Sequence, residues 1–173
     1  KRDWSSDVCS SDLFLIKQGQ PLPSLRLAVW QARQLEAFLE YVKQGSRTIG
    51  SELCGRFGKT TFAGAAIREF NAPLTIITSY ILTSFTSFEN DLSGFEEFKD
   101  LVLVDTKDED YQETIDLNLA QGKQVVAFVS LCAGGSRQSR IDFLSSRSVQ
   151  RLWFIDEADY GAQRASQANM LKQ

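Results

Sequence analysis

Residues 51–61 have the sequence Ser-Glu-Leu-Cys-Gly-Arg-Phe-Gly-Lys-Thr-Thr, and the interpretation of the whole chain depends on them. Gly58-Lys59-Thr60 is the core of a phosphate-binding loop, in which glycine allows close backbone approach, lysine reaches the β- and γ-phosphates and the hydroxyl coordinates Mg²⁺. The full pattern has glycine at position 53, where this chain has Leu53. A plain turn followed by a helix explains the same residues equally well, so the loop needs a partner elsewhere in the chain.

The composition favours one globular domain and excludes several classes of site. The chain has 173 residues, of which 43% are hydrophobic, and this is enough to bury one core. The formal net charge is −3, so a nucleic-acid partner would need a local basic patch. Histidine is absent, which excludes histidine-based triads and histidine metal sites. The sequence contains no apolar run long enough for a transmembrane helix, so no membrane association is expected.

The first residues do not have the pattern of a helix or a strand. Asp3 to Leu13 can be encoded by the reverse complement of a common sequencing adapter, so we interpret residues 1–13 as adapter-derived and disordered. A short native tail is the alternative, and the domain is assigned to residues 14–173. Without Cys9, only Cys54 and Cys132 remain, and their spacing does not suit a metal site. With no secretory signal, this usage predicts a reducing, cytoplasmic setting.

Apolar runs of strand length alternate with helical patterns along the remaining chain. Helices are expected over residues 25–42, 60–70, 80–98, 107–121 and 138–147. Strands are expected over residues 47–53, 74–78, 101–104, 125–129 and 151–155. This alternation predicts an α/β fold with a mainly parallel sheet that helices cover on both faces. A ligand should then bind at the carboxyl ends of the strands.

An acidic pair, Asp156-Glu157, directly follows the last apolar strand. Parallel strands end at the same edge of a sheet, so we expect Lys59 and Asp156 to lie close together. Thr60 and Asp156 would then hold Mg²⁺, and Glu157 would polarise the attacking water. A solvated acidic strand end is the alternative. The expected nucleotide-binding residues of the loop are Gly55, Arg56, Phe57, Gly58, Lys59, Thr60 and Thr61.

These motifs resemble those of the superfamily 2 helicases. Asp156-Glu-Ala-Asp159 is similar to motif II of that family. Glu52 to Thr60 resembles motif I, especially in restriction-type and phage-type DEAD/DEAH ATPases, which often replace the first glycine of the loop. The interval between the two motifs also matches the first RecA-like domain of the family.

A third, shorter match lies upstream of the loop. Residues 33–37, Arg-Gln-Leu-Glu-Ala, are similar to the Arg-x-x-Gln-x-x-Ala region of the family, which implies that Gln34 reads the adenine edge. Gln31 is also available for this role. An exposed helical glutamine without a ligand is an equally good interpretation.

The resemblance implies the ATP-binding, RecA-like domain of a nucleic-acid-dependent ATPase, a helicase or translocase that uses Mg²⁺. DNA is favoured over RNA as the partner, and the strand ends at Ser79–Tyr80 and Ser130–Leu131 are expected to face it. The motif that follows motif II and the second RecA-like domain with its arginine fingers are not in this sequence. We therefore expect weak ATP binding and poor hydrolysis by this piece alone. A packaging-motor ATPase, a nucleotide kinase and an inactive nucleotide-binding module are the alternatives.

Overall fold

The computed structural model describes residues 22, 24–46, 49, 58–80, 84–131 and 137–156. These residues divide between two compact units. The first unit takes its residues from 1–69 and 88–99, and the second takes them from 70–87 and 100–173. The segment interpreted as adapter-derived, residues 1–13, lies outside the described residues.

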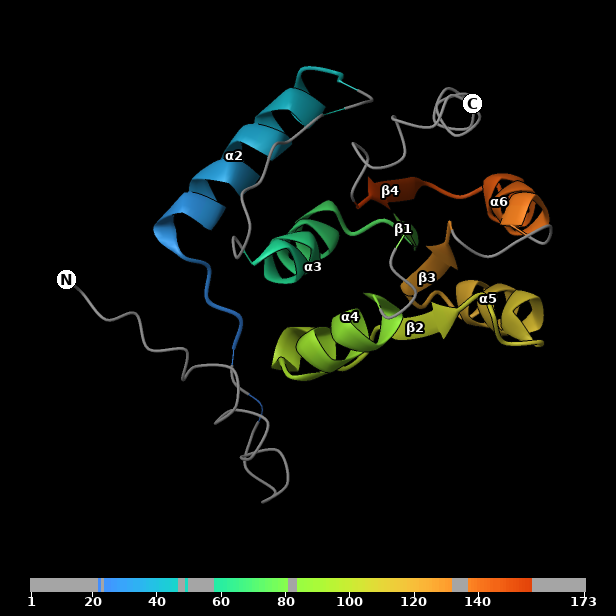
Figure 1. Ribbon diagram of the computed structural model, residues 1–173. Coiled ribbons are helices and arrows are strands. Elements are labelled where there is room, and N and C mark those ends of the chain that lie inside the picture. The colour runs from blue at the N-terminus through green and yellow to red at the C-terminus, as the bar shows by residue number, and fades with distance from the viewer. Residues whose placement is uncertain are drawn as a thin grey trace. The chain divides into compact units, whose positions relative to one another are not determined.

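The second unit contains a parallel β-sheet. Its strands are β1 (Leu74–Ser79), β2 (Val102–Asp105), β3 (Val125–Ser130) and β4 (Arg151–Ile155). The spatial order is β2-β3-β1-β4, and every neighbouring pair is parallel. Figure 1 shows the four strands of this sheet. All four predicted apolar strands from Leu74 onward therefore form, and the predicted α/β class is confirmed.

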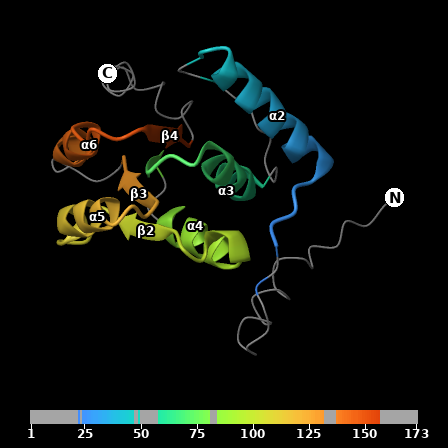
Figure 2. The same ribbon diagram turned by 180° about the vertical axis from the view of Figure 1, so that it is seen from behind.

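Both faces of the sheet are apolar, which explains the continuous hydrophobic runs. On one face, Leu74 pairs with Val125 and belongs to a buried core that also includes Leu144. The helices α5 (Tyr111–Ala120) and α6 (Arg137–Ser145) contribute to this core and lie beside β2 and β3 in both views (Figures 1 and 2). On the opposite face, Phe128 of β3 makes an edge-to-face contact with Phe85, with ring centroids 4.9 Å apart. Phe85 belongs to α4 (Ser84–Ser93), so helical residues cover this face too.

The first unit is helical. It contains α2 (Val29–Lys43), most of α3 (Lys59–Phe70), the end of α4 and the 3₁₀ helix η1 (Glu96–Phe98). Gly64 lies in the buried part of α3, where an added Cβ would be 2.7 Å from Leu92 and 3.0 Å from the ring of Phe98. The small residue therefore lets α3 approach these two side chains closely.

Several predicted helix boundaries differ from the structure. The helix expected from residue 107 begins only at Tyr111, because residues 106–110 form a turn. The single helix expected over residues 80–98 is wrong, because α4 ends at Ser93 and Phe95 adopts an extended conformation before η1. The rings of Phe95 and Phe98 pack edge to face, with centroids 6.2 Å apart. A continuous helix would also have placed these two side chains on the same face, so their spacing did not reveal the break. The helix expected from residue 25 begins only at Val29, because Ala28 is extended and acts as its N-cap. Of the strand expected over residues 47–53, only Ile49 is described, and it lies in no regular element.

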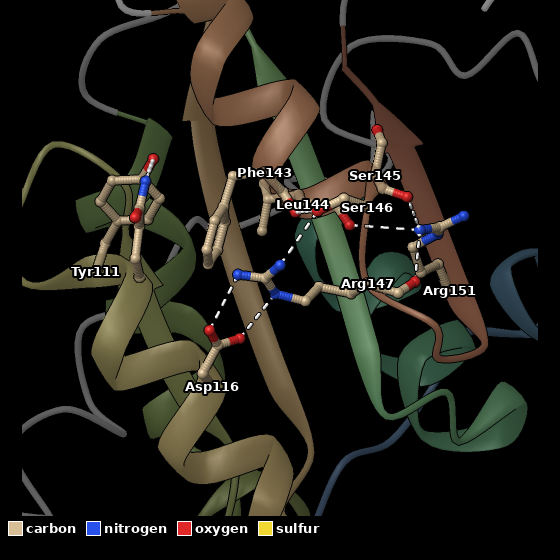
Figure 3. Close-up of polar contacts among 9 residues, drawn as sticks. Tyr111, Asp116, Phe143, Leu144, Ser145, Ser146, Arg147 and Arg151 are labelled. Atoms are coloured by element: carbon tan, nitrogen blue, oxygen red, sulfur yellow. Dashed lines mark hydrogen bonds and ion pairs between the residues drawn. The ribbon is translucent and has the colours of Figure 1, made fainter.

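An arginine connects α5 to the end of α6 in the second unit (Figure 3). Arg147 forms a two-pronged ion pair with Asp116 of α5, with nitrogen–oxygen distances of 2.7 and 3.0 Å. Its guanidinium also lies 3.7 Å from the centre of the Phe143 ring, which contacts Tyr111 edge to face. Nearby, Arg151 donates to main-chain carbonyls at the end of α6, including that of Leu144, which have no helical donors.

The Arg147 contacts are expected to stabilise the second unit modestly. Replacing Arg147 with methionine removes the ion pair and the cation–π contact but keeps much of the apolar stem. Because the Asp116 side chain is 52% exposed, we expect a loss of only about 1 kcal/mol in unfolding free energy. Urea denaturation would measure this loss. The matched control is Arg68→Met, which removes an exposed pair with the adjacent Glu69 and a longer, 4.0 Å contact with Glu97. Equal effects of the two substitutions would contradict a specific role for Arg147.

Candidate functional site

The described part of the chain includes some of the predicted site residues. Gln34, Gly58, Lys59, Thr60 and Thr61 belong to the first unit, and Asp156 belongs to the second. The remaining predicted residues lie outside the described ones, and they are Gly55, Arg56, Phe57 and Glu157. The two halves of the predicted site are therefore described separately.

Gly58 is the residue at which α3 starts. Its carbonyl accepts the first helical hydrogen bond, from the Phe62 amide at 3.0 Å, which makes Gly58 the N-cap. Its φ of +77° lies in the left-handed region, which glycine adopts without the steric cost that a side chain brings. The predicted helix start at residues 59–60 is thus confirmed. The positive φ of residue 58 explains why glycine occupies the position before the helix.

The start of α3 is electrostatically suited to an anion. Helix N-termini direct main-chain N–H groups outward and carry a partial positive charge. Lys59 is exposed at the first helical position, and the first turn contains no acidic residue that would oppose an anion. Thr60 and Thr61 follow, both half-buried, and supply hydroxyl groups in the same turn. This arrangement can bind a phosphate group through main-chain amides, an ammonium and a hydroxyl.

Asp156 lies directly at the carboxyl end of β4. Its main-chain N–H donates to the Thr78 carbonyl at 2.9 Å, so the sheet holds the backbone in register up to this residue. The residue is half-buried. Because β1 and β4 are parallel, Asp156 lies at the sheet edge where α/β proteins bind their ligands.

Hydroxyl groups are found at the same edge of the sheet. Ser79 and Ser130 are register partners at the ends of β1 and β3, and both are buried. The Ser130 hydroxyl has no hydrogen-bond partner among the residues that the structure describes. The structure confirms that Ser79 and Ser130 end neighbouring strands, whereas their contact with nucleic acid stays a prediction.

The chemistry of Thr60 and Asp156 suits Mg²⁺, which prefers oxygen ligands. Among the described residues, no group of three or more histidine, cysteine or acidic side chains is placed to hold a metal. A nucleotide-bound Mg²⁺ does not need such a group, because one or two protein oxygens combine with water and substrate phosphates. The two residues belong to separate units, so their pairing on one ion stays a prediction.

Gln31 of α2 contacts Gly58, the residue before α3. Gln31 is buried, and its side-chain amide lies 3.4 Å from the Gly58 carbonyl. Gln34 is half-buried three positions further along α2, and its contact with adenine stays a prediction. The sequence does contain a signal that Gln31 caps α2, since glutamine is favoured three residues after an N-cap. The signal is weak because Ala28 does not have the usual N-cap side chain.

The fold and these residues define an α/β protein with an all-parallel sheet, an arrangement consistent with a RecA-like domain. Comparisons with protein-family models, with curated proteins and with solved structures found no match. None of the described helices combines the length and apolar character needed to cross a membrane.

Proposed function

We propose that this chain is the ATP-binding part of a nucleic-acid-dependent ATPase of the helicase or translocase type. The observation that carries the proposal is the left-handed N-cap Gly58, followed at once by exposed Lys59 and by Thr60 at the start of α3. Asp156, at the carboxyl end of β4, adds the acidic group that such a site requires. The motif resemblance supplies the class of ATPase.

Each residue has a defined role in the proposed site. The main-chain amides of the α3 N-terminus and the Lys59 ammonium bind the β- and γ-phosphates. Thr60 and Asp156 hold Mg²⁺, which, when bound, neutralises charge that develops on the phosphate oxygens. Glu157, next in sequence, orients the attacking water. Gln34 contacts the adenine edge in this proposal.

The proposed partners follow from the same resemblance. Nucleic acid, with DNA favoured over RNA, would run across the carboxyl edge of the sheet near Ser79 and Ser130. Arginine fingers would come from a second RecA-like domain, and such groups contribute roughly 10³–10⁵ in rate in related enzymes. The isolated chain is therefore proposed to bind ATP but to hydrolyse it slowly. A cytoplasmic location is proposed from the cysteine usage alone.

Equilibrium binding of a fluorescent ATP analogue tests the proposal on the chain as it is. We expect saturable binding that unlabelled ATP reverses, with an affinity that falls when EDTA removes Mg²⁺. Hydrolysis should be slow and should rise with single-stranded DNA once a second RecA-like domain is present. An absence of binding at millimolar nucleotide would contradict the proposal. Binding followed by DNA-independent hydrolysis would indicate another P-loop NTPase.

A further inference from the structure

Gln31 is a buried polar side chain that connects two helix starts. Only 7% of the residue is exposed, so its amide group needs hydrogen-bond partners within the protein. Its side-chain oxygen accepts the Ala28 amide at 2.9 Å, which satisfies the N-cap N–H of α2. Its side-chain nitrogen donates to the Gly58 carbonyl at 3.4 Å. One carboxamide therefore contacts the N-cap residues of α2 and α3.

The orientation of this carboxamide follows from the chemistry of its partners. A main-chain N–H can only donate, and a carbonyl can only accept. The oxygen of Gln31 must therefore face Ala28, and its nitrogen must face Gly58. A carboxylate or an apolar side chain at this position would lose the contact with Gly58.

Gly58 also packs directly against this amide. A Cβ added to Gly58 would lie 2.6 Å from the Gln31 side-chain nitrogen, a distance that forces one of the two groups to move. The same Gly58 carbonyl accepts the Phe62 amide at the start of α3. Gln31 thus touches the carbonyl that defines where α3 begins and the backbone that precedes Lys59.

This geometry differs from that of a side chain that reads a base. A base-reading glutamine presents its donor and acceptor pair to the ligand, whereas the polar atoms of Gln31 both contact the main chain of this protein. The side chain is also more than nine-tenths buried. The contacts instead match a residue that holds the phosphate-binding backbone in place.

We propose that Gln31 is a positioning residue for the phosphate site. This inference rests on the function proposed above. Gln31 links the N-terminus of α3 to α2 by hydrogen bonds, so that the main-chain amides that follow Gly58 point at the phosphates. Its effect should therefore be the same for every ligand that carries a polyphosphate, whatever the base. Inorganic tripolyphosphate, which has no base, is the probe that separates positioning from base reading.

The test is the substitution Gln31→Met in the full chain, with binding of ATP, GTP and tripolyphosphate measured in the presence of Mg²⁺. Methionine loses the hydrogen bonds to both Ala28 and Gly58, and with them the fixed backbone at the start of α3. This loss should weaken binding of all three ligands by about tenfold, with the ATP-to-GTP preference unchanged. Gln44→Met is the matched control, because Gln44 is an exposed glutamine at the other end of α2, where its side-chain amide donates to the Glu40 carboxylate. The control should bind like the wild type.

Three outcomes overturn the inference. Equal binding by Gln31→Met and the wild type rejects positioning while leaving the phosphate site intact. A loss confined to ATP assigns Gln31 to base reading instead. A wild-type chain that binds none of the three ligands rejects the phosphate site and the inference together.

A second set of variants covers the case in which Gln31→Met does not fold. Gln31→Glu keeps the acceptor for Ala28, loses the donor to Gly58 and adds a buried negative charge, so a loss of affinity at least as large is expected. Gly58→Ala should weaken tripolyphosphate binding less in a Gln31→Ala background than in the wild type, because the shorter side chain removes the 2.6 Å contact. Strictly additive effects would contradict a direct coupling between the two residues.

Discussion

Replacing Lys59 with alanine is expected to weaken Mg²⁺–ATP binding about 100-fold or more, which corresponds to roughly 2.8 kcal/mol. Lysine contributes a charge-assisted contact to the β- and γ-phosphates, and alanine at position 59 has neither the charge nor the donor. Stability should barely change, because Lys59 is exposed at the first position of α3. Alanine also favours the helix, and a cation at a helix N-terminus opposes the helix dipole.

Isothermal titration with Mg²⁺–ATP, paired with urea denaturation, measures both parts of this prediction. Lys123→Ala is the matched control, because Lys123 is an exposed lysine near the start of β3 that contacts Asn118. The control should retain wild-type affinity. Unchanged ATP binding in the Lys59 variant would reject the phosphate site at the start of α3.

Replacing Asp156 with asparagine is expected to abolish most of the Mg²⁺-dependence of nucleotide binding. The wild-type affinity should rise about tenfold or more with Mg²⁺, whereas the variant should show almost no gain, because a neutral amide is a poor ligand for this cation. The backbone should stay in place, since the hydrogen bond to Thr78 involves the main-chain N–H of residue 156. Hydrolysis, where it is measurable, should fall about 100-fold or more, because Mg²⁺ supports the transition state.

Parallel titrations with Mg²⁺ and with EDTA separate cation binding from nucleotide binding. Asp105→Asn is the matched control, because Asp105 is also a half-buried aspartate at the carboxyl end of a strand, where it accepts the Lys107 amide. The control should respond to Mg²⁺ like the wild type. If both variants respond equally, Asp156 is an acidic strand end without a role at the cation.

Local patterns were sufficient to predict most regular elements. Runs such as 125–129 were predictable as strands because they are short and continuously apolar, and every residue in this run is indeed buried in the sheet. The start of α3 was predictable because Gly58 is a turn residue and a helical pattern with three alanines, Ala63, Ala65 and Ala66, follows it. The helix over residues 80–98 failed for a local reason too, since Gly94 interrupts a pattern that is otherwise amphipathic.

The candidate site was predictable only in part. Lys59, Thr60 and Asp156 were identified because each follows a recognisable turn or strand end. Both Gln31 and Gln34 were candidates from the sequence, because a motif match specifies a residue type and cannot show which glutamine of the helix contacts Gly58. That choice depends on how α2 packs beside the start of α3, which in turn depends on contacts between residues far apart in sequence.

The sequence by itself determined which segments become strands or helices, and that a glycine and a lysine begin α3, because hydrophobic period and turn chemistry are local properties. Only the tertiary structure decided the strand order β2-β3-β1-β4, because the similar apolar sequences of the strands do not specify which strands pair with each other. It also decided that Gln31 contacts Gly58 and that Arg147 pairs with Asp116. Such pairs form only when the folded chain brings buried or facing side chains within hydrogen-bond distance.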